Sequence, residues 1–306
     1  MVAAKENERC WYVAQIKPFQ DYLRTECGLA ANTALAYGCD LQRFSAFCGD
    51  LKLKDPEKLT PLQLQNFARF LSEEKLATSS ISRHLSSVKM FFRFLILIGM
   101  VKKSHCDLME SPKTWQRLPK VLNKKLTVDL VTAIDAKSPM FLRDRTMMEL
   151  LYATGMRASE AAGLVLRDFN FQIGYLRCLG KGEKERIIPI HTTAVNYAKD
   201  YLENLRPKLL GKKQETAFFL SRTGRPLNRV EVWRIVLKAA QQAGLTGKVT
   251  PHTLRHCFGS HLLAGGADLR SVQEMLGHAD VSTTQIYTHV DHEYLRSVHK
   301  QFHPKA

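Results

Sequence analysis

The sequence lacks the features that mark secreted, membrane-spanning and zinc-ribbon proteins. Its seven cysteines are odd in number, they are scattered, and none belongs to a C-x-x-C pair. This pattern argues against a disulfide framework and favours the reducing cytoplasm. The N-terminal segment has no apolar signal-peptide core, and the longest apolar stretch, residues 94–101, is too short to cross a bilayer. We expect that stretch to form the buried end of a helix.

Acidic residues are also in deficit. The 306 residues include 45 Lys and Arg but only 29 Asp and Glu, which gives a net charge of +16. This excess favours a polyanionic partner, because basic side chains that neutralise phosphates release counterions. A basic protein with no nucleic-acid role is the alternative. Apolar residues make up 45% of the chain, enough for two domains with cores of their own.

Helical periodicity dominates the first third of the chain. Residues 11–48 form two apolar-periodic segments separated by Gly28, and two further helices are expected to begin near Thr60-Pro61 and Ser79-Ser80. Four helices in about a hundred residues predict a small all-α domain, which we place at residues 1–110.

The remainder divides into a linker and a second, mainly helical domain. Residues 111–125 are basic, contain prolines and lack periodicity, so they predict a linker that is either a solvated tether or lies along a phosphate backbone. We place the second domain at residues 126–306. Within it, residues 174–190 differ, because two apolar runs flank Gly180-Lys181-Gly182 and predict a β-hairpin.

A candidate anion site begins at Thr250. Thr250 can cap a helix that has Pro251 at its first position, which puts His252 and Arg255 on one helical face near the N-terminus. Helix N-termini attract anions, so this pair could grip a phosphate. The H-x-x-R pattern is weak by itself, and it also fits a surface helix.

Two further candidate residues follow downstream. Gly277 suits the left-handed end of a short helix, which leaves His278 at a turn where it can face a ligand. Tyr287 follows nine residues later. Taken alone, a tyrosine is more often a packing residue than a nucleophile.

In their order and spacing, these motifs resemble the tyrosine recombinase, or phage integrase, family. Most similar are the bacterial XerC/XerD-type recombinases, which resolve chromosome dimers. The resemblance extends to the T-x-x-x-Y-x-x-D-L-x-x-F pattern that begins at Thr33 and to residues 295–304, and no catalytic position departs from the family pattern. The matching segments are A-T-G-M-R-A-S-E at 153–160, G-K-G at 180–182, H-T-L-R-H at 252–256, L-G-H-A at 276–279 and Q-I-Y-T-H-V at 285–290.

The resemblance implies a role for each matching residue. Tyr287 would attack the scissile phosphate and form a 3′-phosphotyrosyl bond, while Arg157 and Arg255 would hold the two non-bridging oxygens. Lys181 would protonate the leaving 5′-oxygen. The other implied catalytic residues are His252 as an acid or base near the nucleophile, His278 as a donor to the phosphate, and Glu160 as the carboxylate that orients His252 or Arg157.

This set of residues suffices chemically without a metal or an energy-rich cofactor. Phosphodiester transfer needs charge neutralisation and positioning, which arginine, lysine and histidine side chains supply. Ligation needs no ATP, because one phosphodiester is exchanged for another. The alternative, zinc bound by His252, His256 and Cys257, lacks an H-E-x-x-H or paired-cysteine pattern. We therefore expect neither a metal nor a cofactor.

Two surfaces are candidates for binding DNA outside the active site. One is a polar, basic stripe on the expected fourth helix, which in the family docks on DNA; the other lies between the hairpin and the His252 helix. Side chains of these types suit contacts with phosphates and with the groove. The first surface consists of Ser80, Arg83, Ser87 and Lys89, and the second of Arg229, Trp233 and Arg234.

The sequence and the resemblance together predict a mainly α, two-domain clamp on DNA. It would have an N-terminal four-helix, SAM-like core-binding domain and a C-terminal α-rich catalytic domain with a small antiparallel β-sheet. The family implies a homo- or hetero-tetramer on two duplexes. Chromosome or plasmid dimer resolution at cell division would add a second Xer-type recombinase and a DNA translocase. A mobile-element integrase, a monomeric type IB topoisomerase-like enzyme and a catalytically inactive DNA-binding protein are the alternatives.

The C-terminal residues predict a short amphipathic helix. Leu295, Val298 and Phe302 recur at helical spacing, and an apolar stripe on so short a helix must be buried to be worth ordering. The helix either folds back on its own domain or docks into a neighbouring subunit. The resemblance favours the neighbour.

Overall fold

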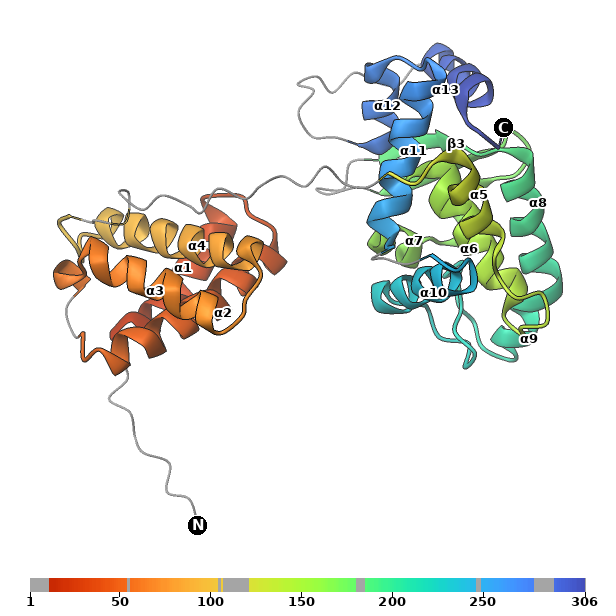
Figure 1. Ribbon diagram of the computed structural model, residues 1–306. Coiled ribbons are helices and arrows are strands. Elements are labelled where there is room, and N and C mark those ends of the chain that lie inside the picture. The colour runs from red at the N-terminus through yellow and green to blue at the C-terminus, as the bar shows by residue number, and fades with distance from the viewer. Residues whose placement is uncertain are drawn as a thin grey trace. The chain divides into compact units, whose positions relative to one another are not determined.

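The computed structural model describes residues 11–53, 56–103, 106, 121–179, 185–245, 249–277 and 289–305. The chain forms two compact units, residues 1–117 and 118–306 (Figure 1). The predicted mainly helical fold with one small antiparallel sheet is confirmed. No helix within the described residues is long and apolar enough to cross a membrane.

The described part of the first unit contains four α-helices, as predicted. Its core is rich in phenylalanine, and Phe19, Phe44 and Phe67 are fully buried. The third helix begins where expected, because the Thr60 hydroxyl and the Gln63 side chain form a reciprocal capping box. The helices are α1 (Trp11–Thr25), α2 (Ala31–Asp50), α3 (Pro61–Glu73) and α4 (Thr78–Leu97), with a 3-10 turn at Pro56–Lys58.

The prediction that residues 94–101 form a buried helix end is wrong in part. Phe94, Leu95 and Val101 are buried, but α4 ends at Leu97, whose side chain is 65% exposed. Apart from Val101, the apolar residues beyond Leu95 lie past the end of the core, and none of the described helices of this unit covers them. The other exposed side chains of this segment are Ile96, Ile98 and Met100.

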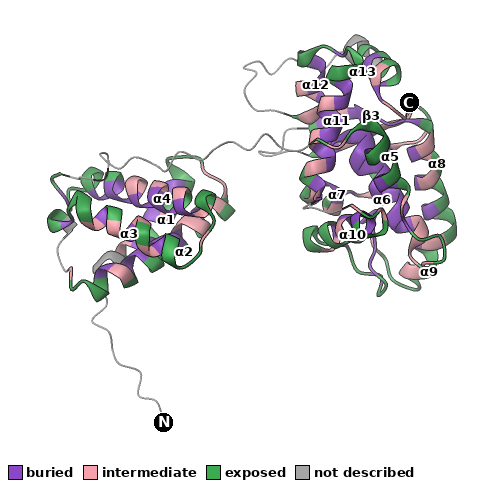
Figure 2. Cartoon of the chain, viewed as in Figure 1, coloured by how far each residue is buried: buried purple, intermediate pink, exposed green. Residues whose placement is uncertain are grey.

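The second unit is organised around α6 (Phe141–Thr154). Every residue from 143 to 154 is buried, and Figure 2 shows the helix at the centre of its unit. Lys124 and Lys125, expected in the linker, instead open a helix, because the Asn123 side chain accepts a hydrogen bond from the amide of Leu126. The other helices are α5 (Lys124–Thr132), α7 (Ala158–Gly163), α8 (Thr192–Asp200), α9 (Arg206–Leu210), α10 (Arg229–Gln242), α11 (Pro251–Gly265), α12 (Leu269–Leu276) and α13 (His289–Phe302).

The predicted β-hairpin is confirmed. Strands β2 (Tyr175–Leu179) and β3 (Glu185–Pro189) pair antiparallel, and a two-residue strand, β1 (Phe169–Asn170), adds to the edge of β2. Cys178 and Arg186 are partners in the register, and both side chains are buried. The hairpin therefore presents one of its two faces to the core of the second unit.

The predicted C-terminal helix exists, and in this single chain it packs on its own unit. Helix α13 contacts α11 and β3, and Leu295 and Val298 are buried. Burial lowers the pKa of His299 to about 4, and its neutral ring donates through Nε2 to the carbonyl oxygen of Ala153 at 2.8 Å. Beyond the helix, the Lys305 ammonium lies 2.6 Å from Oε2 of the buried Glu149. Docking of this helix into a neighbouring subunit, which the resemblance implies, stays a prediction.

Candidate active site

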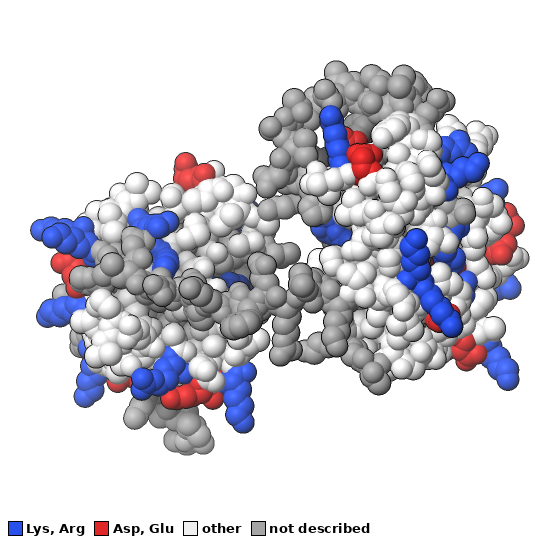
Figure 3. All heavy atoms as spheres, turned by 45° about the horizontal axis from the view of Figure 1, so that its top comes forward, with Lys and Arg blue, Asp and Glu red and all other residues white. Residues whose placement is uncertain are grey.

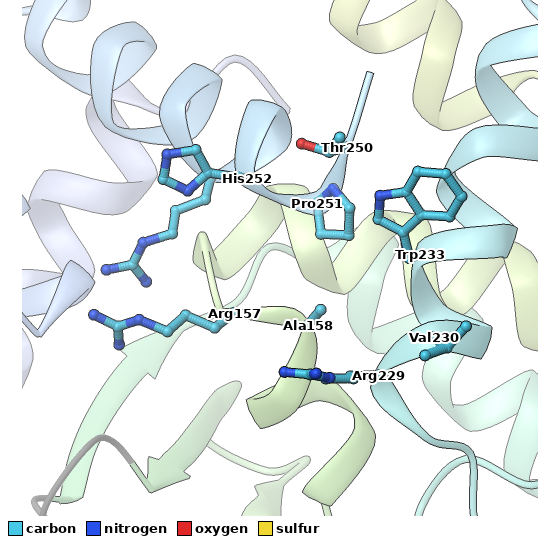
Figure 4. Close-up of a pocket in the computed structure, with 9 residues that line it drawn as sticks. Arg157, Ala158, Arg229, Val230, Trp233, Thr250, Pro251 and His252 are labelled. Atoms are coloured by element: carbon cyan, nitrogen blue, oxygen red, sulfur yellow. The ribbon is translucent and has the colours of Figure 1, made fainter. Parts of the chain in front are cut away.

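A pocket of about 510 Å³ opens at the N-terminus of α11 (Figure 4). It brings together three of the predicted catalytic residues, Arg157, His252 and Arg255. Lys181, His278 and Tyr287 lie outside the described residues. The pocket is lined by Arg157, Ala158, Arg229, Val230, Trp233, Thr250, Pro251, His252 and Arg255.

The start of α11 fixes His252 and Arg255 at different depths. Thr250 caps the helix through a capping box with Thr253, and Pro251 occupies the first turn, as the sequence predicts. His252 is exposed at the pocket, whereas Arg255, one turn further on, is 7% exposed. The helix therefore presents an imidazole at the surface and a guanidinium beneath it.

Two backbone carbonyls hold the Arg255 guanidinium. Its Nη1 donates to Gly155 O at 2.8 Å and its Nη2 to Leu276 O at 2.5 Å. Burial, together with the neighbouring positive charge of Arg157, lowers the pKa of Arg255 to about 10. The group is still charged at neutral pH, and a partly desolvated cation interacts with a phosphate more strongly than one in bulk water.

Gly155 gives Arg157 its position. It ends α6 in the left-handed conformation, with φ +59°, and a Cβ at this position would lie 2.5 Å from the Phe258 ring. The chain therefore turns sharply, and Arg157 precedes the first residue of α7. The Arg157 amide donates to Glu160 Oε2 at 2.7 Å, and its guanidinium Nη1 donates to Glu160 Oε1 at 2.8 Å.

Glu160 is a buried, ionised carboxylate. Burial alone would raise its pKa, but hydrogen bonds from Arg186 and then from Arg157 bring it below its ordinary value. Its side chain is 6% exposed. Of the two residues that Glu160 was expected to orient, Arg157 and His252, it contacts Arg157.

Arg186 is a residue of this site that the motif reading missed. It is 4% exposed, and its Nη1 and Nη2 donate to the two oxygens of Glu160 at 3.1 and 2.6 Å. A third bond runs from its Nε to Met275 O, at 3.0 Å. The sequence does contain a signal. Side chains alternate between the two faces of a strand, and Arg186 occupies a position that faces the core, between two positions that face outward. Lysine or arginine at such a position needs a buried partner.

The first DNA-binding stripe is only partly available at the surface. The prediction for Ser87 is wrong, because its side chain is fully buried and its hydroxyl donates to His84 O at 2.8 Å. The Arg83 side chain remains 47% exposed and donates through Nε and Nη2 to the buried Asp40 carboxylate, at 2.9 and 2.8 Å. Ser80 and Lys89 are half-buried. The helix was predicted correctly, but its buried face is wider than the apolar pattern indicates.

The residues of the second candidate DNA-binding surface line two different cavities. Arg229 lines the pocket that contains Arg157, and Trp233 lies beside Pro251 on the same side of that pocket (Figure 4). Arg234 instead lines a cavity of about 370 Å³, together with Arg222, Lys238 and others. Figure 3 shows that Lys and Arg side chains are distributed over both units on the face drawn, with Asp and Glu side chains among them. Arg229 and Trp233 are thus the members of this surface that line the same pocket as the predicted catalytic arginines.

Two family models match the chain. The phage integrase family matches residues 120–293, and the N-terminal SAM-like domain of phage integrases matches residues 16–99. The chain belongs to the phage integrase family of tyrosine recombinases. The recombinase is 44% identical over 293 residues to tyrosine recombinase XerD of Listeria monocytogenes, a match that covers 95% of this chain and 99% of that relative. It is accordingly an enzyme that breaks and rejoins DNA at specific sites.

Solved structures share the fold of this recombinase. The XerH site-specific recombinase bound to its difH substrate, in a pre-cleavage complex, has a TM-score of 0.68 at 23% identity, over 93% of this chain and 83% of that one. A lambda integrase tetramer bound to a Holliday junction has a TM-score of 0.67 at 20% identity, over 90% and 79% of the two chains. At these identities the similarity concerns the fold.

Proposed function

We propose that this recombinase cleaves and rejoins duplex DNA through Tyr287. The tyrosine oxygen would attack the scissile phosphorus, form a 3′-phosphotyrosyl ester and release a 5′-hydroxyl; attack by a 5′-hydroxyl from the partner strand would reverse the step and restore the tyrosine. The observation that supports this most is the joining of Arg157, His252 and Arg255 in one pocket. A phosphoryl-transfer site requires such a concentration of positive charge and hydrogen-bond donors.

The two pocket arginines would bind the phosphate. Guanidinium groups match two phosphate oxygens and stabilise the charge that grows in the pentacoordinate transition state. Arg255 is held by backbone carbonyls and Arg157 by Glu160, so neither needs to reorganise when charge develops. His252, exposed one turn before Arg255, would accept the proton of the Tyr287 hydroxyl during cleavage and return it during ligation. His278 would donate to the phosphate.

The proposed reaction is tested with a nicked suicide substrate in a buffer that contains a chelator and no ATP. We expect a covalent protein–DNA band on a denaturing gel, in the same yield as with Mg²⁺, because the charge is supplied by side chains. Strand transfer to an added 5′-hydroxyl oligonucleotide should follow. Loss of cleavage in the chelator would contradict the proposal and point to a metal mechanism.

Lys181 is the proposed general acid. Its loss should matter most when the leaving group is poor, because a poor leaving group needs a proton as the bond breaks. A substrate with sulfur in place of the bridging 5′-oxygen leaves without protonation. We expect Lys181→Ala to cleave the normal substrate at least about a hundredfold more slowly than the wild type, and to cleave the sulfur substrate at close to the wild-type rate. Equal defects on both substrates would assign Lys181 to DNA binding alone.

Both units would contact the DNA. We assign core binding to residues 1–110, with contacts from Ser80, Arg83 and Lys89, and catalysis to residues 126–306, with added contacts from Arg229 and Arg234. The net charge of +16 fits this use. A structural neighbour is a tetramer on a Holliday junction, and we propose that this recombinase likewise acts as four protomers on two duplexes.

The biological task that fits best is resolution of chromosome or plasmid dimers before cell division. Support comes from the match with XerD over nearly the full length of both chains. The task would place the recombinase in the cytoplasm, and it would involve a second Xer-type recombinase and a DNA translocase as partners. A mobile-element integrase uses the same chemistry and would differ in its DNA site.

Deletion of residues 295–306 tests the use of the C-terminal helix. In the isolated chain this segment buries Leu295 and Val298 against its own unit. We propose that, when protomers assemble, the segment leaves its own unit and binds the equivalent surface of a neighbouring protomer. The truncated protein should bind a single site with an affinity within about threefold of the wild type, unfold at a lower temperature because apolar burial is lost, and pair two duplexes poorly.

Gel shifts on one site and native mass measurement of paired-site complexes separate these effects. Normal pairing and recombination by the truncated protein would show that the helix serves its own unit only.

A further inference from the structure

Arg186 joins three segments that are far apart in the sequence. It lies on β3, it donates two hydrogen bonds to Glu160 on α7, and it donates one to the carbonyl of Met275 in the last turn of α12. The next carbonyl, Leu276 O, receives Arg255. Arg186 is therefore one contact away from each of the two guanidiniums that are proposed to hold the phosphate.

Gly277 shows how closely the Arg186 side chain is enclosed. The residue ends α12 in the left-handed conformation, with φ +66°, and a Cβ there would lie 3.1 Å from Cδ of Arg186 and 3.2 Å from its Nη1. Only glycine avoids both the backbone strain and the contact. The absence of a side chain at Gly277 thus leaves room for the Arg186 guanidinium in the orientation that it adopts.

The distribution of hydrogen bonds on Glu160 explains what this guanidinium does. Arg186 gives the carboxylate two nitrogens, and Arg157 gives it only one side-chain nitrogen, Nη1. The Arg157 side chain remains 42% exposed, whereas Arg186 is almost wholly buried. Because Arg186 donates to both oxygens of the carboxylate, Glu160 orients Arg157 through one side-chain hydrogen bond. The other nitrogens of the Arg157 guanidinium do not bond to Glu160.

The charges of the cluster lead to the same conclusion. Three guanidiniums lie near the single carboxylate of Glu160: Arg157 and Arg186 donate hydrogen bonds to it, and Arg255 interacts with it electrostatically. The pentacoordinate transition state of phosphodiester transfer carries two negative charges. Arg186 neutralises Glu160 from the buried side, which leaves the charge of the two pocket arginines for the phosphate.

The geometry points to Arg186 as a positioning residue for the reaction: a buried arginine that touches no DNA and fixes Arg157 through Glu160 and Arg255 through the end of α12. This inference rests on the proposed phosphate-binding role of those two arginines. Without Arg186, the Arg157 guanidinium would be drawn into a two-pronged contact with Glu160, away from the phosphate. A displacement of this kind by about 1 Å can lower a rate by roughly a hundredfold.

The test uses Arg186→Gln and Arg186→Lys in the full-length protein. Glutamine removes the charge, and lysine keeps the charge but offers one nitrogen in place of the three that bond to Glu160 and to the Met275 carbonyl. Arg177→Gln is the matched control, because Arg177 lies on the neighbouring strand and pairs with Asp168 and Glu185 on a more exposed face. Each protein is measured for single-site DNA affinity and for the first-order rate of covalent capture at saturating enzyme, normalised to the fraction that binds DNA.

We expect both Arg186 variants to bind the site with an affinity within about threefold of the wild type and to form the covalent complex about tenfold to a hundredfold more slowly, as misplaced rather than missing groups do. Arg177→Gln should react at the wild-type rate. The double variant Glu160→Gln, Arg186→Gln should be little slower than the slower single variant, because the two residues act through one contact. Wild-type capture in the same series tests the proposed function separately.

Two outcomes would overturn the inference. One is a normalised capture rate equal to the wild type in Arg186→Lys and Arg186→Gln. The other is a decrease in covalent capture that is no larger than the decrease in the fraction of protein that binds DNA. A residue with a purely structural role gives that pattern. If Arg186→Gln does not fold, Arg186→Lys and Glu160→Gln supply the same comparison.

Discussion

Replacing Arg255 by alanine should slow covalent capture of DNA by about a thousandfold, because loss of one preorganised donor to a developing oxyanion already costs 10²–10³ in rate and this donor is also charged. The guanidinium is 7% exposed and its pKa is lowered to about 10, so its charge acts from a partly desolvated position. Arg255→Lys should recover little, since the single nitrogen of an ammonium cannot replace both Nη1, which bonds to Gly155 O, and Nη2, which bonds to Leu276 O.

The measurement is the single-turnover rate on a suicide substrate at saturating enzyme. Alanine also leaves the carbonyls of Gly155 and Leu276 without their donor, which costs about 1–3 kcal/mol of stability for a buried group. Thermal unfolding and DNA affinity are therefore recorded beside the rate. Arg270→Ala, on the exposed side of α12, is the control for removing an arginine. A rate for Arg255→Ala within tenfold of the wild type would remove Arg255 from the phosphate site.

Replacing Tyr287 by phenylalanine should abolish the covalent complex below the limit of detection. Only the hydroxyl is lost, so the arginine and histidine groups of the pocket remain and DNA should bind with an affinity within about threefold of the wild type. The variant is incubated with the nicked substrate and analysed on a denaturing gel. A covalent band from this variant, in any yield comparable to the wild type, would assign the nucleophile to another residue.

Local signals allowed the positions of helices and turns to be predicted from the sequence. The α11 start at Thr250 and the α12 end at Gly277 were predicted correctly, because capping hydroxyls and left-handed glycines act on their immediate neighbours. The hairpin at 174–190 was found for the same reason. The joining of Arg157 to Arg255 was implied by the family pattern, since about a hundred residues separate them in the chain and no local rule connects them.

Long-range packing was not predictable in this way. Ser87 looked like a surface serine of a polar stripe, yet α4 turns it inward to bond to its own helix backbone. Arg186 was not singled out from the sequence, because its importance follows from Glu160 and Met275, which belong to other elements. The C-terminal helix has an apolar stripe that specifies burial but not which subunit provides it.

The most direct test of the central claim is to identify the atom of the protein that joins the DNA. Wild-type recombinase is trapped on a suicide substrate, the complex is digested with protease and nuclease, and the residual adduct is located by tandem mass spectrometry. The account predicts a single adduct, on Tyr287, in which the tyrosine oxygen is esterified to a 3′-phosphate. An adduct on any other residue, or one joined to a 5′-phosphate, would contradict it.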